Sequence, residues 1–443
     1  MDSQKLIKPR LGLMMFLQFF IWGGFFVTMG VYLLEIFQGE EGLNTIIGQA
    51  YATHNWGAVL APVVVGLIAD RYFNAERVMG VCHLLGAGVL WYAAGITDPG
   101  TFIWVMLAYF MLYMPTLALV NAISFANIDN PDKEFPAIRV WGTIGWIIAG
   151  FVVAQTILGW INIPFLSIFS GVDNAQVTNV PLLMSAIVSI VYGLYSFTLP
   201  ATPPSEKGKK FSFKEAFGLD ALKLLSDRSF AVFSFSCLAI SIPLAFYYAR
   251  ANDYVAAVAF GEQSASFMTI GQMSEGLFMV LIPFFLVRFG VKYMLLAGML
   301  AWTLRYLLFG MFPESVAMVM VGIALHGICY DFFFVTGQLY VDKKAPKSLR
   351  ASAQGFFGIL TYGAGMLIGN YLLGWWGEFV NLVGSTEAGW LAGAAAFWIM
   401  PGILALAVAV MFFILFKDDG AEVPEIKTFA DPESGKVSPS TNT

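Results

Sequence analysis

The sequence has little charge and few cysteines. Asp, Glu, Lys and Arg make up only 12% of its 443 residues, whereas a soluble domain carries about 25%. The three cysteines, Cys82, Cys237 and Cys329, all fall within apolar runs, which argues against a disulfide framework. These shortages exclude an ordinary soluble globular protein and a disulfide-stabilised secreted domain.

Motifs for several kinds of chemistry are also missing. The chain contains no Walker-type phosphate loop, no Cys/His cluster with metal-ligand spacing and no recognisable set of nucleophile and base. We therefore expect no enzyme activity, no cofactor, no metal site and no nucleic-acid partner.

Long apolar runs are abundant instead. Hydrophobic residues make up 58% of the chain, and many runs approach the roughly 20 residues that span a bilayer. The first run lacks a small-residue cleavage site, so we expect it to remain as a membrane helix. The sequence predicts an all-α polytopic membrane protein with the lipid bilayer as its solvent. Its twelve transmembrane helices are expected at about 11–37, 45–70, 77–97, 101–127, 138–160, 180–199, 229–256, 263–287, 292–312, 315–341, 349–380 and 388–416.

The basic residues are distributed unevenly across these spans. All of the 24 Lys and Arg except Arg250 and Arg305 fall on one side of a twelve-span arrangement. The connections on the other side carry acidic residues. Because cytoplasmic loops are enriched in Lys and Arg, we expect both termini and the central loop to be cytoplasmic.

The longest polar connection, 200–228, divides the chain into two halves of six helices. The halves, 1–199 and 229–416, echo each other: short basic turns contain Arg71 and Arg288, and Arg139 and Arg350 open the fifth helix of each half. Parallel repeats with a site between them are typical of secondary transporters. The polar tail, 417–443, is expected to be disordered.

Two carboxylates interrupt the apolar runs. Asp331 lies in the run 319–335 and Glu275 in the run 267–285. A charged side chain at the bilayer centre costs roughly 2.5–3.5 kcal/mol on insertion scales. Retaining two of them indicates a polar path through the membrane, and we expect transport driven by protons.

Several motifs resemble those of known transporters. The turn GLIADR, which contains Asp70 and Arg71, is similar to the loop signature of the major facilitator superfamily, in which it has a gating role. Longer strings over almost the whole chain resemble the nucleoside:H⁺ symporter family of that superfamily. These strings are FLQFFIWGGFF, YMPTLALVNAISFAN, FPAIRVWGTIGWI, GLDALKLL, PLAFYYARANDYV, GQMSEGLF, GICYDFFFVTG and KKAPKSLRASAQGF.

The resemblance implies a substrate site on three helices. Arg139, Thr143 and Trp146 share one helical face, as do Gln272 and Glu275. Their guanidinium, hydroxyl, aromatic, amide and carboxylate groups suit the base and ribose of a nucleoside. Two plainer interpretations remain open. Arg139 can be an anchor at the membrane edge, and Glu275 can be a structural partner of a basic residue within the membrane, such as Arg305.

The third helix contributes His326, Tyr330 and Asp331. The family resemblance implies that the first two line the substrate pocket and that Asp331 couples transport to protons, with Glu275 as its rival. The family has an aromatic residue where this chain has His326. That histidine can relay protons or can form an interhelical hydrogen bond.

Taken with the resemblance, these features predict a monomeric transporter of a bacterial inner membrane that takes up nucleosides with protons by alternating access. A departure in the seventh span, where Ala245 and Tyr248 replace amide side chains of the family, leaves an alternative open. That alternative is a proton symporter of the same fold for another small polar metabolite, such as a sugar or a nucleobase.

Overall fold

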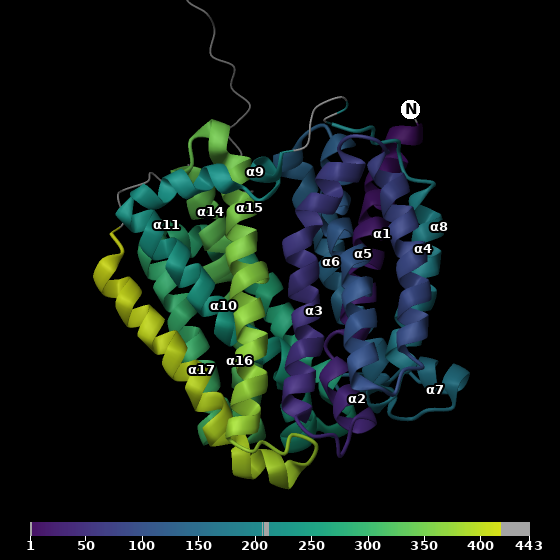
Figure 1. The fold of residues 1–443 in the computed structure, drawn as a ribbon, viewed down its shortest axis with the longest axis vertical. Coiled ribbons are helices and arrows are strands. Elements are labelled where there is room, and N and C mark those ends of the chain that lie inside the picture. Colours follow the sequence, from purple (N-terminus) through teal and green to yellow (C-terminus); the bar gives the residue numbers. More distant parts are fainter. Residues whose placement is uncertain (1, 206, 208–211, 418–443) are drawn as a thin grey trace, which may run out of the picture.

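The computed structural model describes residues 2–205, 207 and 212–417. The tail expected to be disordered therefore lies, except for Lys417, outside the described residues. The chain folds into two groups of helices that stand side by side, α1–α8 in one group and α10–α17 in the other (Figure 1).

The first group is formed by the amino-terminal part of the chain. Its elements are α1 (Asp2–Phe25), α2 (Met29–Ile36), α3 (Leu43–Val64) with a π-helical turn η1 (Val65–Ala69), α4 (Ala75–Ala93), α5 (Pro99–Ala126), α6 (Pro131–Ala154), β1 (Thr156–Ile157), β2 (Ile161–Asn162), α7 (Phe165–Ser170), η2 (Ala175–Val177) and α8 (Val180–Ser196).

The second group follows a connection that contains α9 (Phe213–Ala216) and η3 (Leu219–Ser226). Its elements are α10 (Arg228–Val255), η4 (Ala256–Phe260), η5 (Gly261–Gln263), α11 (Ser264–Met311), α12 (Val316–Ala324), α13 (His326–Tyr330), η6 (Asp331–Val335), α14 (Thr336–Lys344), η7 (Lys347–Leu349), α15 (Arg350–Gly358), η8 (Ile359–Gly365), α16 (Met366–Phe379) and α17 (Glu387–Leu415).

These helices match the predicted spans. In the described part of the chain, eight segments are long and apolar enough to cross a membrane, and one of them, Arg228–Met311, contains α10 and α11. Gly290, at φ 70°, breaks α11 into two spans. α8 is a shorter apolar helix, and α4, of 19 residues, covers most of the third predicted span. These helices confirm the polytopic all-α fold class.

Both boundaries of the fifth span differ from the predicted range 138–160, since α6 begins at Pro131. The fifth span was expected to reach residue 160, but α6 ends at Ala154 and Gln155 adopts a left-handed conformation at φ 54°. The next residues form an antiparallel hairpin in which Thr156 pairs with Asn162. Gly159, with φ 73°, lies in its turn, where the absence of a side chain removes the steric cost of positive φ.

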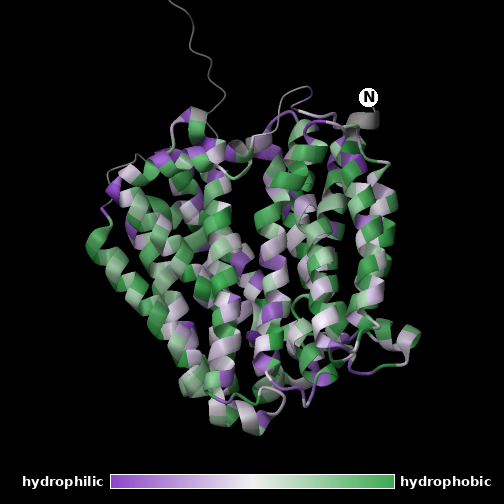
Figure 2. Ribbon diagram, viewed as in Figure 1, coloured by the Kyte–Doolittle hydropathy of each residue, from purple (hydrophilic) through white to green (hydrophobic). Residues whose placement is uncertain are grey.

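The two ends of the bundle differ in charge. We call the end that carries the connections 70–74, 197–227 and 345–349 the basic end, and the end with connections 37–42, 155–179, 256–263 and 380–386 the opposite end. Figure 2 shows hydrophobic segments along the outer helices of both groups. Exposed apolar side chains on these helices, such as Leu85, Val191 and Ile414, are suited to lipid contact.

Close helix crossings join the two halves. α3 packs against α16, and α6 packs against α11. At the first crossing, a Cβ atom on Gly48 would lie 3.2 Å from the Gly374 Cα atom and closer still to the Asn370 carbonyl oxygen. Small residues allow membrane helices to approach closely, so this glycine sets the distance between the halves.

Replacement of Gly48 by alanine should therefore destabilise the protein. The added methyl group has no space, and overpacking costs about 1–3 kcal/mol. The matched control is Gly88→Ala on α4, where a Cβ atom would meet nothing within 4 Å. In thermal unfolding of the purified protein, Gly48→Ala should lower the midpoint and Gly88→Ala should leave it equal or higher. Equal midpoints for both variants would contradict the close crossing.

Candidate functional site

A cavity of about 2510 Å³ separates the halves, and both halves line it. Its walls come from α1, α3, α5 and α6 on one side and from α11, η6, α15 and η8 on the other. The lining includes Phe19, Trp22, Asn121, Arg139, Thr143, Glu275, Tyr330 and Tyr362 inside, and Asp70, Arg71, Arg288 and Gln354 toward the basic end. The cavity thus extends from the middle of the bundle to the basic end.

Hydrogen bonds between the halves close the opposite end. The Asn44 amide nitrogen donates to the Leu382 carbonyl at 3.2 Å, and the Arg250 Nη1 atom donates to the Asn44 Oδ1 atom at 2.5 Å. The Gln176 Oε1 atom accepts from Asn252 at 3.1 Å and from Ser264 at 2.9 Å. This structure is therefore a state that is open at the basic end and closed at the opposite end.

Arg250 is a fully buried cation within that closed end. Its Nε atom lies 2.9 Å from the Asp253 Oδ2 atom, and its guanidinium lies 5.3 Å from the centre of the Trp390 ring. An acidic and an aromatic partner compensate for the loss of water around this charge. The intramembrane arginine that the sequence left without a role is thus part of the closing contact.

Polar contacts between the halves continue beyond the closed end. We call the contacts that join the halves the seam. The Asn55 Nδ2 atom donates to the Tyr362 carbonyl at 2.6 Å, and the Asn370 Nδ2 atom donates to the Asn55 Oδ1 atom at 2.6 Å. His54 stacks on Trp22, with the ring centres 5.2 Å apart. Asn55 therefore joins α3 to the second half directly above the cavity wall.

The predicted residues of α6 lie along the path between the halves. Arg139 and Thr143 line the cavity opposite Glu275 of α11, and the Arg139 guanidinium lies 4.3 Å from the centre of the Phe19 ring. Trp146, one turn further from the basic end, packs edge-on against Trp22 at 5.3 Å. The shared helical face inferred from the sequence is therefore the face toward the second half.

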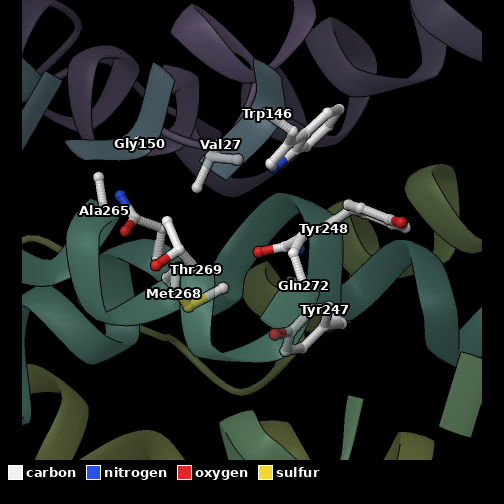
Figure 3. Close-up of a pocket in the computed structure, with 10 residues that line it drawn as sticks. Val27, Trp146, Gly150, Tyr247, Tyr248, Ala265, Met268, Thr269 and Gln272 are labelled. Carbon is white, nitrogen blue, oxygen red and sulfur yellow. The ribbon is translucent and has the colours of Figure 1, made fainter. Parts of the chain in front are cut away.

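Beyond this pair of tryptophans is a second, small pocket (Figure 3). Trp146, Gln272, Tyr247 and Tyr248 line it together with Val27 and Thr269. Its volume of about 20 Å³ holds about one water molecule. In this state a ligand of nucleoside size can therefore fit only in the larger of the two spaces. Gln272 lines the small pocket and not the large cavity.

Asp331 lies in neither space. Its side chain is fully buried, and within the described chain both carboxylate oxygens lack a hydrogen-bond partner. It is the first residue of the π-helical turn η6, a distortion that is frequent at functional sites. Glu275, in contrast, is only partly buried and lines the cavity. The two carboxylates thus differ in their access to water.

His326 is placed behind the cavity wall, where it contacts Arg305. The Arg305 Nη1 atom lies 3.3 Å from the His326 Nδ1 atom, and the Tyr247 ring stacks on the imidazole at 5.1 Å. Because arginine is always protonated, Nδ1 acts as the acceptor and we assign the ring proton to Nε2. Of the two interpretations open from the sequence, the interhelical hydrogen bond is the one that this geometry contains.

Sequence reasoning missed two aromatic residues of the site. Tyr362, in the π-helical turn η8, lines the cavity, and its hydroxyl group is hydrogen-bonded to that of Tyr330. Tyr247 forms part of the small pocket, and the Arg305 guanidinium lies 4.0 Å from its ring centre. Tyrosines within apolar spans were the available signal, but aromatic residues are too frequent in this chain to single them out.

The comparisons with known proteins agree with this architecture. A family model described as nucleoside H⁺ symporter matches residues 6–421. The chain is 39% identical to YegT of Escherichia coli (strain K12), over 94% of this chain and 96% of that protein. It is 33% identical to the xanthosine permease of the same organism, over 93% of this chain and 96% of that protein.

Solved structures give the same result. The crystal structure of the nucleoside transporter NupG superimposes with a TM-score of 0.78 at 30% identity, over 93% of this chain and 99% of that chain. An autoinhibited peptide transporter of the POT family, at 12% identity and a TM-score of 0.66 over 94% of this chain and 96% of that chain, shares the fold alone. The major facilitator architecture is confirmed, and so is the expectation of a transporter rather than an enzyme. The chain belongs to the nucleoside H⁺ symporter family.

Proposed function

We propose that this protein takes up nucleosides together with protons, using the cavity between its halves as the substrate site. The observation that carries this proposal is the presence of two carboxylates in different surroundings. Glu275 lies on the cavity wall, and Asp331 is buried behind it without a hydrogen-bond partner. A substrate contact and a proton carrier are thus available on adjoining helices, since α11 packs against η6.

Nucleoside recognition follows from the cavity lining. The Glu275 carboxylate can accept hydrogen bonds from the two ribose hydroxyls, and Arg139 and Thr143 face it from the other half. The rings of Trp22 and Tyr330 offer apolar faces for the base. Gln272, Trp146 and His326 complete this site in the state in which the opposite end opens, because the small pocket can then widen.

Proton coupling is assigned to Asp331, with Glu275 as the second candidate. An ionised carboxylate without a partner is costly in surroundings of low dielectric constant, so binding a proton relieves that cost. Inward movement of the proton is worth about 2.3 kcal/mol per 100 mV, which corresponds to roughly 50-fold accumulation of the nucleoside.

Alternating access requires that the contacts closing the opposite end break and that contacts at the basic end form. We assign the gating role at the basic end to Asp70 and Arg71, which line the mouth of the cavity. Following the positive-inside rule, we assign the basic end to the cytoplasm, and with it both termini and the loop 200–228. We assign the protein itself to a bacterial inner membrane. The halves 1–199 and 229–416 then act as the two moving units of a monomer.

The substrate class is tested by transport into proteoliposomes that contain the purified protein. Labelled uridine or adenosine should accumulate when the lumen is alkaline, and unlabelled nucleosides should compete, because the cavity offers partners for both base and ribose. Sugars and free nucleobases serve as controls and should compete at least tenfold more weakly. If no nucleoside is taken up or competes, the proposed function is wrong.

The role of Asp331 is tested with Asp331→Asn. This variant keeps the shape of the side chain but cannot exchange a proton, so uphill uptake driven by a pH gradient should be lost while nucleoside exchange between the two sides of the membrane continues. Asp173→Asn, at an exposed position of the opposite end, is the control and should retain both activities. Uphill accumulation by Asp331→Asn would exclude it as the proton carrier.

The role of Glu275 is tested with Glu275→Gln. A hydrogen bond to a charged group is worth about 1.5–3 kcal/mol, so its loss should weaken nucleoside binding by roughly 10-fold to 150-fold. Calorimetric titration of the purified variant measures this change, and its unfolding midpoint without nucleoside serves as the control. A lower midpoint with unchanged affinity would instead indicate the structural role that the sequence left open.

A further inference from the structure

An apolar, uncharged insert separates the fifth and sixth spans. Between Arg139 and Asp173 the chain has no charged residue, although α6 already ends at Ala154. The hairpin β1–β2 and the short helix α7 therefore lie outside the helices that cross the membrane, yet their sequence, TILGWINIPFLSIFSG, is as apolar as a span. Such an apolar composition is unusual for a segment that faces water.

The insert is held in a fixed position. The Gln155 Oε1 atom accepts from the Ser167 backbone nitrogen at 2.7 Å, and the Gln155 Nε2 atom donates to the Asp173 carbonyl at 2.7 Å. At the hairpin, the Leu158 backbone nitrogen donates to the Ser266 hydroxyl at 2.8 Å, which links the insert to α11 in the other half. The direction in which its side chains point is therefore defined.

Most of its large apolar side chains point away from the protein. Leu166 is buried, at only 5% exposed, and packs in a cluster with Val153 of α6 and Met184 of α8. Five large apolar side chains of the insert are more than half exposed: Trp160 (88%), Phe169 (77%), Ile168 (72%), Ile161 (59%) and Phe165 (51%). Exposure of such an apolar surface to water is unfavourable.

The position of α7 coincides with the level at which the spans end. Leu166 contacts the cluster that contains Met184 and Val180, in the first turn of α8, and α7 projects sideways past the ends of α4 and α8 (Figure 1). Its hydrophobic colour continues that of these outer helices (Figure 2). The exposed surface is thus continuous with the lipid-facing surface of α8, where Ile187 and Val191 are exposed.

We infer that this insert, residues 156–170, is an interfacial anchor that docks onto the lipid bilayer at the opposite end. Trp is enriched where the hydrocarbon meets the headgroups. A segment that lies in this layer buries an apolar face of Trp, Phe and Leu without crossing the membrane. The lack of charge in the insert fits lipid better than a charged protein partner. The anchor also positions the hairpin, whose Leu158 backbone nitrogen donates to Ser266 of the other half at the closed end.

Fluorescence quenching tests the anchor. Ile168→Cys and Phe169→Cys variants of the full chain are labelled with a small fluorophore and reconstituted into phosphatidylcholine vesicles. The native Cys82, Cys237 and Cys329 are buried, and the unaltered protein measures any background labelling. Ser385→Cys, at an exposed polar position of another connection at the same end, is the control. Unchanged unfolding midpoints show that the variants fold.

Labels at 168 and 169 should be quenched by lipid that carries a nitroxide near its headgroup about threefold more strongly than the label at 385, since only they lie in the interfacial layer. Iodide in the buffer should show the reverse order. Equal iodide quenching at all three positions, with no lipid quenching, would overturn the anchor. Protection from iodide that disappears when the protein is diluted in lipid would also overturn it, because a second copy of the chain would then cover the surface.

Discussion

A bilayer supplies no water to its interior, so each charged or polar group within the spans must find a partner or face a hydrated cavity. The described structure obeys this constraint in three ways. Arg250 and Asp253 pair with each other, Asn55 and Asn370 pair across the seam, and Arg139 and Glu275 line the cavity. The arrangement of the halves follows from where these groups can be satisfied.

Among the described carboxylates, Asp331 departs furthest from this constraint, and we propose that this departure serves proton coupling. Both of its oxygens are buried without a donor, in a π-helical turn beside a helix that lines the cavity. A proton is the one partner that can satisfy it and then leave. The contacts of Asn44 and Gln176 close the opposite end, and we propose that this open-at-the-basic-end state is the one that releases substrate and proton.

Much of the fold could be predicted from the sequence because the signals are local. Apolar length and the distribution of Lys and Arg defined the spans and the two ends. The hairpin after Ala154 was missed, because its residues are as apolar as the span they follow. The seam could not be predicted, since contacts such as that between Asn55 and Asn370 join residues far apart in the chain.

The candidate site was predicted in part for the same reason. Helical spacing placed Arg139 and Thr143 on one face, and the structure has both on the cavity wall. Spacing could not predict how far each side chain lies from the cavity. His326 and Asp331 lie behind the cavity wall, because a break at Leu325 and the π-helical turn change the α-helical spacing there. The surroundings of His326 also depend on Arg305, which lies on another helix whose position near His326 no local signal could predict.

In the mechanism that we propose, nucleoside and proton move together through this cavity. The pH inside proteoliposomes, read with a trapped dye, tests this coupling when a nucleoside is added outside in the absence of any pH gradient. The lumen should acidify in fixed proportion to the nucleoside that enters. Nucleoside entry with no change in the pH of the lumen would show that the two movements are not coupled.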